Sequence, residues 1–300
     1  MSTPKGVDIE LQARDGLKLR IVHYPVAPSR GVIVFLHGLS EHADRHKLFA
    51  AHLNRAGWRV LVPDLRGHGH SGGVRGGIQQ DDDPLHDLAA VLDLAEQLAP
   101  GELRVLVGHS LGGAVAARFV SALAQPPETA PWVRPVDGLV LSAPALEPTM
   151  GMLQKALLST MGRLMQDLPL PIVFKPEWGS SDPDVIREFE QDPLAHKKVT
   201  PRLAAFIVQH GRIAMSRAAQ WTRQTLVVYT PADRLISPRA CEEFAALLPQ
   251  GLSSIRSFPD LAHDMLRDRG KEKVYQAITQ WLDQVFPADR QARQHAGTYP

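Results

Sequence analysis

The chain has 300 residues, of which 44% are hydrophobic, and it carries 33 lysines and arginines against 32 aspartates and glutamates. This length and apolar content can bury a large core, either as one α/β domain or as two smaller ones. A net charge near zero excludes a field that would favour nucleic acid or a strongly charged membrane surface. The first residues lack an apolar signal-peptide core and no long apolar run occurs, so we expect a cytoplasmic globular protein.

Taken in chain order, the apolar patterns predict an α/β fold with a mostly parallel sheet. Residues 7–25 alternate polar and apolar side chains around Asp15-Gly16, which predicts an antiparallel hairpin. Apolar runs without alternation then predict parallel strands covered on both faces. These runs are GVIVFLHG, WRVLVPDL, LRVLVGHS, DGLVLSAP and TLVVYTP. SIRSFP is the predicted last strand, so the hairpin, the five runs and SIRSFP make eight strands.

Helical patterns supply the crossovers that parallel strands require. They read HKLFAAHLNRAG, PLHDLAAVLDLAEQL, LGGAVAARFVSALA, CEEFAALLPQ and EKVYQAITQWLDQVF. Gly57 is expected to cap the first helix at its C-terminus. Residues 81–83, all aspartates, are expected to form a solvated helix start before Pro84. The single cysteine, Cys241, has no partner for an internal disulfide, and buried packing explains it best.

The regular alternation of strand and helix breaks once, between residues 147 and 220. Two helical patterns and a proline-rich middle replace the next expected strand there. We therefore divide the chain into a core of residues 1–146 and 221–286 and an inserted helical cap of residues 147–220. Residues 287–300 are polar and aperiodic, so we expect a mobile tail.

Small residues crowd around Ser110 in the stretch VLVGHSLGGAVAARFV. Gly108-His109-Ser110-Leu111-Gly112 matches G-x-S-x-G, the turn that presents a nucleophilic serine between a strand and a helix, and both flanks supply those elements. Gly69-His70-Ser71-Gly72-Gly73 matches the same pattern, but it lies in a polar, glycine-broken loop. We therefore predict that Ser110 is the nucleophile and that Ser71 is a turn residue.

A nucleophilic serine needs a histidine as base and a carboxylate that orients the histidine. Position selects among the 13 histidines, because catalytic groups in open parallel sheets gather beyond the carboxyl ends of strands. His263 follows the last strand by a short loop and Asp233 follows TLVVY, whereas His210 and His86 fall in or near helices. The order serine, aspartate, histidine is that of the α/β-hydrolase fold. We therefore predict a catalytic triad of Ser110, Asp233 and His263.

Asp260 and Asp264 are weaker candidates for the acid of this triad. Asp264 adjoins His263 in sequence, which makes the required side-chain contact awkward, and Asp260 lies in the same loop. Asp233 could instead cap the helix that begins near Arg239, but it stands too far upstream for that role.

Acyl transfer also needs N–H donors for the oxyanion of the tetrahedral intermediate. We expect the backbone N–H of Leu111 to supply one and that of Leu39, in the loop after GVIVFL, to supply the other. Nearby histidines raise the alternative of a metal cluster, although cysteine ligands are absent and the acidic residues fit turns and caps. These histidines are His37, His42, His46, His68 and His70. We expect neither a metal nor a cofactor.

Several segments together resemble the monoacylglycerol lipase and lysophospholipase branch of the α/β-hydrolases, a group of the serine aminopeptidase S33 type. They are HGLSEHADRH, PDLRGHGHSGG, GHSLGGAVA, LSAPAL and the spaced Asp233 and His263. The similarity extends from about Val32 to Phe286 and leaves out most of the insert. The resemblance implies the α/β-hydrolase fold with the insert as its cap, and the same triad and oxyanion donors that the residues themselves indicate.

The leading interpretation is a serine carboxylic ester hydrolase that cleaves a lipid-like monoester through an acyl-enzyme. The cap is rich in methionine and leucine, and we expect Met150, Leu153, Leu157 and Met161 to contact the acyl chain. Packing of these residues within the protein is the alternative.

Other acyl chemistry on the same triad, such as thioester or amide hydrolysis or acyl transfer, is a second interpretation, and a non-catalytic binding protein of this fold is a third. The expected partner is a small lipid-like ester and not nucleic acid. The sequence leaves open a transient contact of the cap with a membrane surface, and it predicts no oligomeric state.

Overall fold

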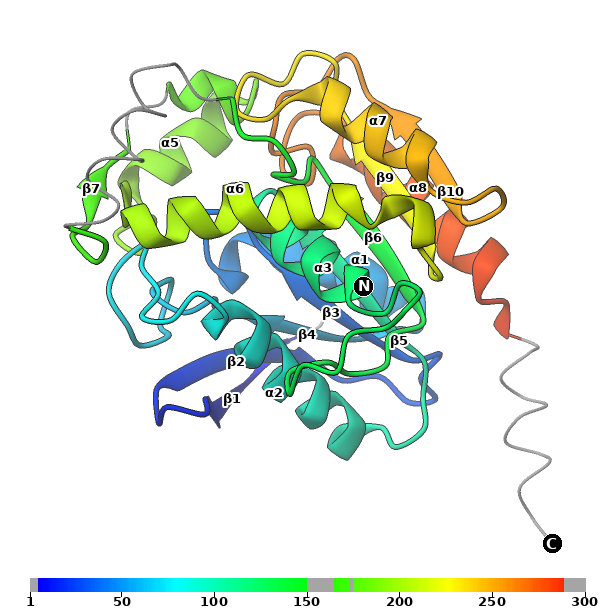
Figure 1. Cartoon of the computed structure of the whole chain (residues 1–300). Helices are drawn as coiled ribbons and strands as arrows, with labels where there is room; N and C mark the ends of the chain where they lie inside the picture. Colours follow the sequence, from blue (N-terminus) through cyan, green and yellow to red (C-terminus); the bar gives the residue numbers. More distant parts are fainter. Residues whose placement is uncertain (1–4, 150–164, 173–174, 289–300) are drawn as a thin grey trace, which may run out of the picture.

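The computed structural model of the chain describes residues 5–149, 165–172 and 175–288 (Figure 1). An eight-stranded sheet lies at its centre. Its strands are β1 (Val7–Gln12), β2 (Lys18–Tyr24), β3 (Val32–Leu36), β4 (Arg59–Pro63), β5 (Arg104–His109), β6 (Gly138–Ser142), β9 (Gln224–Tyr229) and β10 (Ser253–Ser257). The spatial order is β1-β2-β4-β3-β5-β6-β9-β10. β2 pairs antiparallel with β1 and β4, and all later neighbours pair in parallel, which confirms the predicted sheet.

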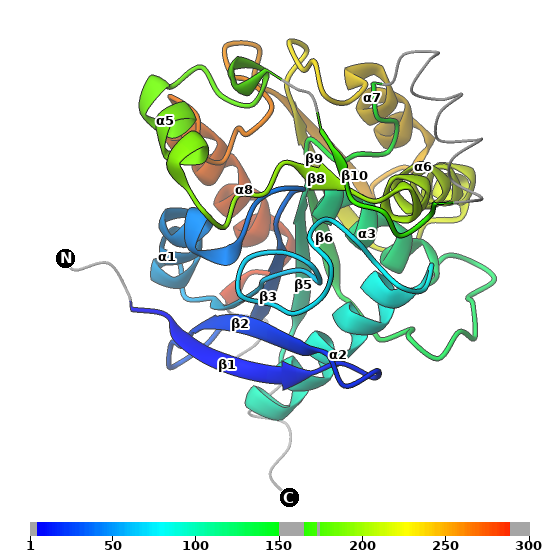
Figure 2. The same cartoon turned by 90° about the vertical axis from the view of Figure 1, so that its left-hand side faces the viewer.

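Helices cover both faces of this sheet, as predicted. The helices of the core are α1 (Lys47–Arg55), α2 (Asp83–Leu98), α3 (Leu111–Ser121), α7 (Pro238–Leu247) and α8 (Lys271–Val285). α1 and α8 lie on one face, and α2, α3 and α7 lie on the other (Figure 2). Gly57 follows the end of α1 with a φ of 89°, a left-handed conformation that suits a helix C-terminus. The prediction for Gly57 is therefore confirmed, as is the buried position of Cys241.

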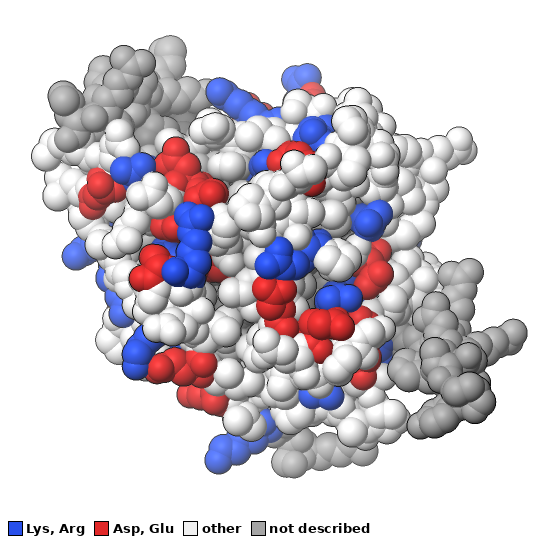
Figure 3. All heavy atoms as spheres, turned by 60° about the horizontal axis from the view of Figure 1, so that its bottom comes forward, with Lys and Arg blue, Asp and Glu red and all other residues white. Residues whose placement is uncertain are grey.

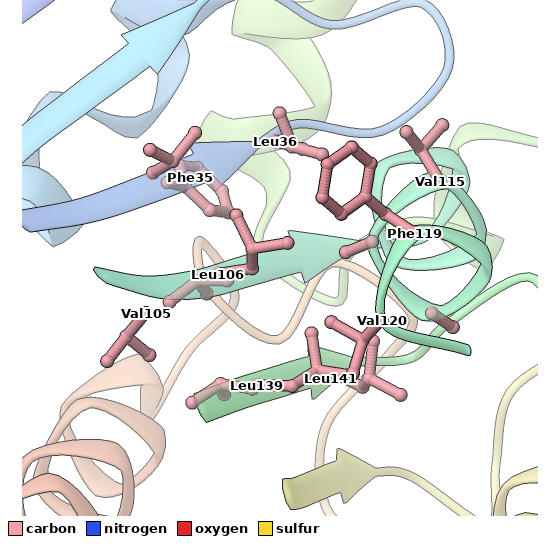
Figure 4. Close-up of a cluster of buried hydrophobic side chains, with 14 of the residues drawn as sticks. Phe35, Leu36, Val105, Leu106, Val115, Phe119, Val120, Leu139 and Leu141 are labelled. Carbon is pink, nitrogen blue, oxygen red and sulfur yellow. The ribbon is translucent and has the colours of Figure 1, made fainter. Parts of the chain in front are cut away.

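The core lies on both faces of the sheet, and one part of it lies between the central strands and the helix that follows β5. Figure 4 shows Leu36 of β3 beside Phe119 of α3. Phe35, the neighbouring residue of β3, packs instead against Phe49 of α1. All five residues of β3 and of β6 are buried, which explains why these strands read as unbroken apolar runs. The packed helix α3 fixes the end of β5, where Ser110 follows.

The helix α2 begins at Asp83, as predicted, but the expected solvent exposure is wrong for Asp83. We expected residues 81–83 to be a solvated helix start, yet Asp83 is buried at the first residue of α2. Its Oδ2 accepts the backbone N–H groups of Gln79 and Gln80 and lies 3.7 Å from Nη1 of Arg66. The aspartate therefore closes the preceding turn and pairs with a buried arginine, contacts that a helix-start pattern does not reveal.

The segment between β6 and β9 contains no strand of the central sheet among its described residues. It forms a short two-stranded sheet, β7 (Leu170–Pro171) with β8 (Lys198–Val199), and the helices α5 (Pro183–Gln191) and α6 (Pro201–Ser216). α6 crosses α3 (Figure 1), and a Cβ on Gly211 would lie 2.3 Å from the carbonyl oxygen of Leu146. The residues expected to contact an acyl chain, Met150, Leu153, Leu157 and Met161, lie outside the described residues, as does nearly all of the predicted tail 287–300.

The surface carries both signs of charge. Basic and acidic side chains are intermixed over the face drawn in Figure 3, as expected for a chain with a net charge of +1. Within the described ranges, every helix is too short or too polar to cross a membrane.

Candidate active site

Ser110 is the single residue between the end of β5 and the start of α3. Its φ of 52° and ψ of −115° are unfavourable for a side chain with a Cβ, and such strain costs on the order of 1–3 kcal/mol. The surrounding backbone holds this conformation. The Ser110 N–H donates to the carbonyl of Ser142 at 3.0 Å, and the Ser110 carbonyl accepts the N–H of Ala145 at 3.0 Å.

Close backbone contacts explain why glycines surround Ser110 in the sequence. A Cβ on Gly108 would lie 2.4 Å from the carbonyl oxygen of Gly112, and one on Gly112 would lie 2.2 Å from that of Leu36. A Cβ on Gly113 would lie 2.8 Å from Pro144. Real Cβ atoms do not approach backbone this closely, so only glycine permits β5, α3 and the loop after β3 to converge behind the serine.

The structure brings the three predicted triad residues together. Nε2 of His263 lies 2.9 Å from Oγ of Ser110, and Nδ1 of His263 lies 2.6 Å from Oδ2 of Asp233. Asp233 follows β9 and His263 follows β10. Parallel strands end at one edge of the sheet, so their trailing loops deliver both side chains to Ser110.

Asp233 is held as an oriented carboxylate. Its Oδ1 accepts the backbone N–H groups of Leu235 at 2.8 Å and Ile236 at 3.1 Å. Burial alone would raise the pKa of Asp233, but the charge of His263, the hydrogen bond with it and the two backbone donors outweigh burial, so the pKa is lowered. The carboxylate is therefore ionised at neutral pH and faces His263 with the oxygen that its own turn does not use.

The alternatives to these residues lie elsewhere or bind other groups. Asp260 is exposed, and the Asp264 side chain makes no hydrogen bond with His263. His210 lies in α6, and His86 lies in α2 and contacts Asp82.

Ser71 is a buried turn residue, as predicted. Its hydroxyl donates to the carbonyl of Asp64 at 2.6 Å and accepts the N–H of Arg20 at 2.9 Å. Both hydrogen bonds hold the loop after β4, so the second G-x-S-x-G match, at residues 69–73, has a structural role.

Two residues that carry the predicted backbone N–H donors line the cavity beside Ser110. They are Leu39, in the loop after β3, and Leu111, the first residue of α3. Within the described part of the chain neither N–H has a hydrogen-bond acceptor. These are the two groups that the sequence predicts as oxyanion donors.

Glu41 is a buried residue of this loop that sequence reasoning missed. Its Oε2 accepts the N–H of Gly38 at 2.7 Å and that of His46 Nε2 at 3.2 Å. Burial would raise the pKa of Glu41, but the charge of His46 and the hydrogen bond with it dominate, and the pKa lies well below its usual range. Ser40 turns the chain with a φ of 67°, and Glu41 points back at the loop and fixes the His37–Gly38 peptide, one peptide before the one that carries the Leu39 N–H. An acid three residues beyond a strand-end glycine was the available signal.

The histidines considered as a metal cluster are used separately. His37 accepts the N–H of Leu65 with Nε2 and donates from Nδ1 to the Gly38 carbonyl. His42 contacts Asp192, His46 contacts Glu41, and His68 contacts the Arg66 carbonyl. Hydrogen bonds of loops and turns therefore explain most of these histidines.

A cavity of about 550 Å³ opens above Ser110. Polar groups of Glu41, His109, His263 and Asp264 lie at one end. The rest of the wall is mainly apolar and includes Val185, Ile186 and Phe189 of α5, Val199 of β8, Ile207 of α6 and Leu235. An elongated apolar group can thus lie against the segment between β6 and β9 while its polar end reaches Ser110.

The sheet, the strained serine and the residues that meet it define an α/β-hydrolase. The chain belongs to the family described as serine aminopeptidase, S33 (Hydrolase_4), which matches residues 27–270. A monoacylglycerol lipase from Mycolicibacterium smegmatis is 28% identical over 261 residues, covering 86% of this chain and 90% of the relative. Phospholipase YtpA from Bacillus subtilis is 26% identical over 263 residues, covering 85% and 96%.

Solved structures agree with this family. A monoacylglycerol lipase from Paleococcus ferrophilus has a TM-score of 0.75 and 26% identity, covering 94% of this chain and 99% of that one. A soluble variant of the Saccharomyces cerevisiae monoglyceride lipase, solved with a substrate analogue, has a TM-score of 0.82 over 95% of this chain and 97% of its own. At 17% identity the yeast structure shows the shared fold alone.

The pH dependence of hydrolysis tests the base. Burial would lower the pKa of His263, but the charge of Asp233, the hydrogen bond with it and the charges of Asp264 and Glu41 outweigh burial, so the pKa lies above 6.5. His263 must be neutral to accept a proton, so kcat/KM should fall as pH drops through a value above 6.5, by about tenfold per pH unit. A pH profile of kcat/KM with a non-ionising ester measures this fall in activity on the acidic side. Activity should return when the pH is raised again. A midpoint of the acidic fall below pH 6.5 would contradict the assignment of His263 as the base.

Substitution of Glu41 tests its effect on the oxyanion loop. Glu41→Gln keeps an oxygen for the Gly38 N–H, whereas Glu41→Ala does not. We expect Glu41→Ala to lower kcat by up to about a hundredfold with little change in KM, because a misplaced donor loses transition-state stabilisation. Glu41→Gln should recover most of that loss, and thermal unfolding should show that both variants are folded. Equal losses in the two variants, or an effect on KM alone, would argue against positioning through Gly38.

Proposed function

We propose that the chain is a serine hydrolase that cleaves the carboxylic ester of a lipid-like substrate with one acyl chain. The single observation that carries this proposal is the continuous set of contacts from Asp233 through His263 to Ser110, at 2.6 and 2.9 Å, at the floor of a largely apolar cavity. The names of the lipase relatives support an ester as the substrate.

In the proposed mechanism, Oγ of Ser110 attacks the ester carbonyl while Nε2 of His263 takes its proton. Asp233 keeps the imidazole in the tautomer that accepts at Nε2, and stabilises the imidazolium that forms. The N–H groups of Leu39 and Leu111 stabilise the oxyanion. The alcohol leaves with the proton from His263, and water activated by the same histidine then releases the fatty acid from Ser110.

We also propose that residues 147–220 act as a cap that shapes the acyl site. Support comes from polar contacts that hold α5 over the cavity. His42 and Arg45 of the core contact Asp192 at 2.7 and 3.3 Å, and Arg267 contacts Glu188 at 2.5 Å. A cap held by such contacts exposes the apolar face of α5 to the cavity. The acyl-contact role of Met150, Leu153, Leu157 and Met161, the cytoplasmic location and a membrane contact of the cap stay predictions.

Removal of the nucleophile tests the activity directly. Ser110→Ala should lower kcat for ester hydrolysis by on the order of a millionfold and should abolish labelling by a fluorophosphonate probe. Ser71→Ala is the matched control, because it changes the same motif in the loop after β4 and should keep labelling and most activity. Circular dichroism checks folding. Labelling that persists in Ser110→Ala would contradict the proposal, and a wild-type chain that is neither labelled nor active would favour a binding protein.

The charge of the leaving group tests the substrate class. Glu41 and Asp264 border the cavity. Of the arginines that also border it, Arg45 is paired with Asp192 and Arg234 is exposed. For an assumed separation of about 8 Å, repulsion between a phosphate and one carboxylate costs roughly 2 kcal/mol at an effective dielectric constant of about 20. We expect kcat/KM for a 1-acylglycerol to exceed that for the 1-acylglycerol 3-phosphate of the same chain length by about thirtyfold. Asp264→Asn should reduce the difference in kcat/KM between the two substrates, because it removes one negative charge. Equal rates, or faster cleavage of the phosphate ester, would favour a lysophospholipase.

The family description raises amide hydrolysis as the second candidate. The observation that favours it is the pair of carboxylates at the polar end of the cavity, since an acidic group can bind the ammonium of a peptide N-terminus. Aminoacyl p-nitroanilides compared with p-nitrophenyl esters of graded chain length distinguish the two. A preference for the anilides would replace the ester proposal.

A further inference from the structure

Three buried side chains beside the nucleophile have no role in the proposed proton relay. Glu41, His109 and Asp264 each offer one ligand atom, and these atoms lie within 4.8 Å of one another. The residues come from three different places in the fold: the loop after β3, the end of β5 and the loop after β10. All three border the cavity, so a small solute that enters the cavity can reach them.

The groups that face one another in this cluster are acceptors. Nδ1 of His109 donates to the carbonyl oxygen of Ser142 at 3.1 Å, which leaves Nε2 with its lone pair. Oε2 of Glu41 accepts the hydrogen bonds described above, so Oε1 is available. Asp264 is only 7% exposed, and its Oδ1 has no hydrogen-bond partner among the described residues. Buried acceptors without a donor are costly, so the cluster demands a cation or a hydrogen-bond donor.

Nearby arginines do not meet this demand. Arg45 contacts Asp192 of the cap, and Arg267 contacts Glu188 of α5. Nη1 of Arg267 lies 3.9 Å from Oδ2 of Asp264, which is too long for a hydrogen bond. Each arginine therefore has a carboxylate of its own in the segment between β6 and β9. Arg267 lies within ion-pair distance of Asp264, but neither arginine donates a hydrogen bond to Glu41 or Asp264 in the described chain.

We propose that Glu41, His109 and Asp264 form a binding site for a divalent transition-metal ion, best suited to zinc, and that the bound ion inhibits hydrolysis. One imidazole nitrogen and two carboxylates suit zinc better than calcium or magnesium, which prefer oxygen alone. The hydrogen bond from His109 to a backbone carbonyl is the kind of contact that orients a metal-binding imidazole. Ligand bonds of about 2.0–2.2 Å require the three atoms to approach one another by roughly 1 Å.

Inhibition follows from the position of the site. The ring of His109 lies 5.0 Å from that of His263, and His263 must become positively charged when Ser110 attacks. A divalent cation beside it opposes that charge, and it replaces the favourable effect that Asp264 and Glu41 have on the imidazolium. The binding of zinc does not depend on the proposed function. Only its inhibitory effect rests on that proposal.

The test is an equilibrium titration of the full chain, stripped of metal, with zinc in competition with a chromophoric chelator. Asp264→Asn removes one ligand, and Asp260→Asn is the matched control because it changes an exposed aspartate of the same loop. We expect one site that Asp260→Asn leaves unchanged and Asp264→Asn weakens at least tenfold. The zinc concentration that halves hydrolysis should rise by the same factor, and calcium and magnesium should neither compete nor inhibit.

Two further measurements keep the outcome decisive. If Asp264→Asn does not fold, His109→Gln removes the nitrogen ligand and should weaken zinc binding to a similar extent. Titration of Ser110→Ala with zinc measures binding in a chain without the nucleophile. The binding result therefore does not depend on whether the protein hydrolyses esters. No binding at micromolar zinc, or binding that neither Asp264→Asn nor His109→Gln weakens, would overturn the site. Binding without inhibition of an active enzyme would overturn its inhibitory role.

Discussion

The site depends on a backbone conformation that Ser110 would not adopt alone. A φ of 52° is unfavourable for serine, and the surrounding structure compensates for that cost through hydrogen bonds and close packing behind the residue. Gly112 lies against the carbonyl of Leu36 and Gly108 lies against Gly112. The same approach places the N–H of Leu111 and the loop with Leu39 around one point above the hydroxyl. The strained backbone of Ser110 and the glycines beside it thus result from the same requirement, the close approach of backbone segments behind the serine.

The acids near Ser110 differ in how their charge is balanced. Asp233 has two backbone donors on one oxygen and His263 on the other, so all of its contacts favour the ionised state. Glu41 also has two donors, but both approach a single oxygen. Asp264 keeps a buried oxygen without a donor in the described chain. The three carboxylates thus differ in how many of their oxygens have hydrogen-bond donors. Asp233, with donors on both oxygens, orients the base, whereas Glu41 and Asp264 can still accept an external group.

The sequence predicted the parts of the site that local pattern determines. Apolar runs and the turn residues between them were enough to find eight strands, and Asp233 and His263 followed because each lies in the loop after a strand. Glu41 and His109 were missed as partners of Asp264. Their proximity arises where two loops meet the end of β5, which no short sequence window contains. Asp83 was misjudged for the same reason, since Arg66, with which it pairs, lies in the loop after β4 and outside the local helix-start pattern.

Chemistry and specificity have separate origins in this fold. The triad and its donors belong to loops anchored on the parallel strands, whereas much of the apolar wall comes from α5, in which no residue is buried. α5 contacts the core through polar side chains, chiefly Glu188 with Arg267 and the following Asp192 with His42. Residues on its cavity face, such as Ile186, carry little of the packing that stabilises the core. The wall can therefore change in shape and length at small cost to stability, while strain at Ser110 restricts change at the reacting centre.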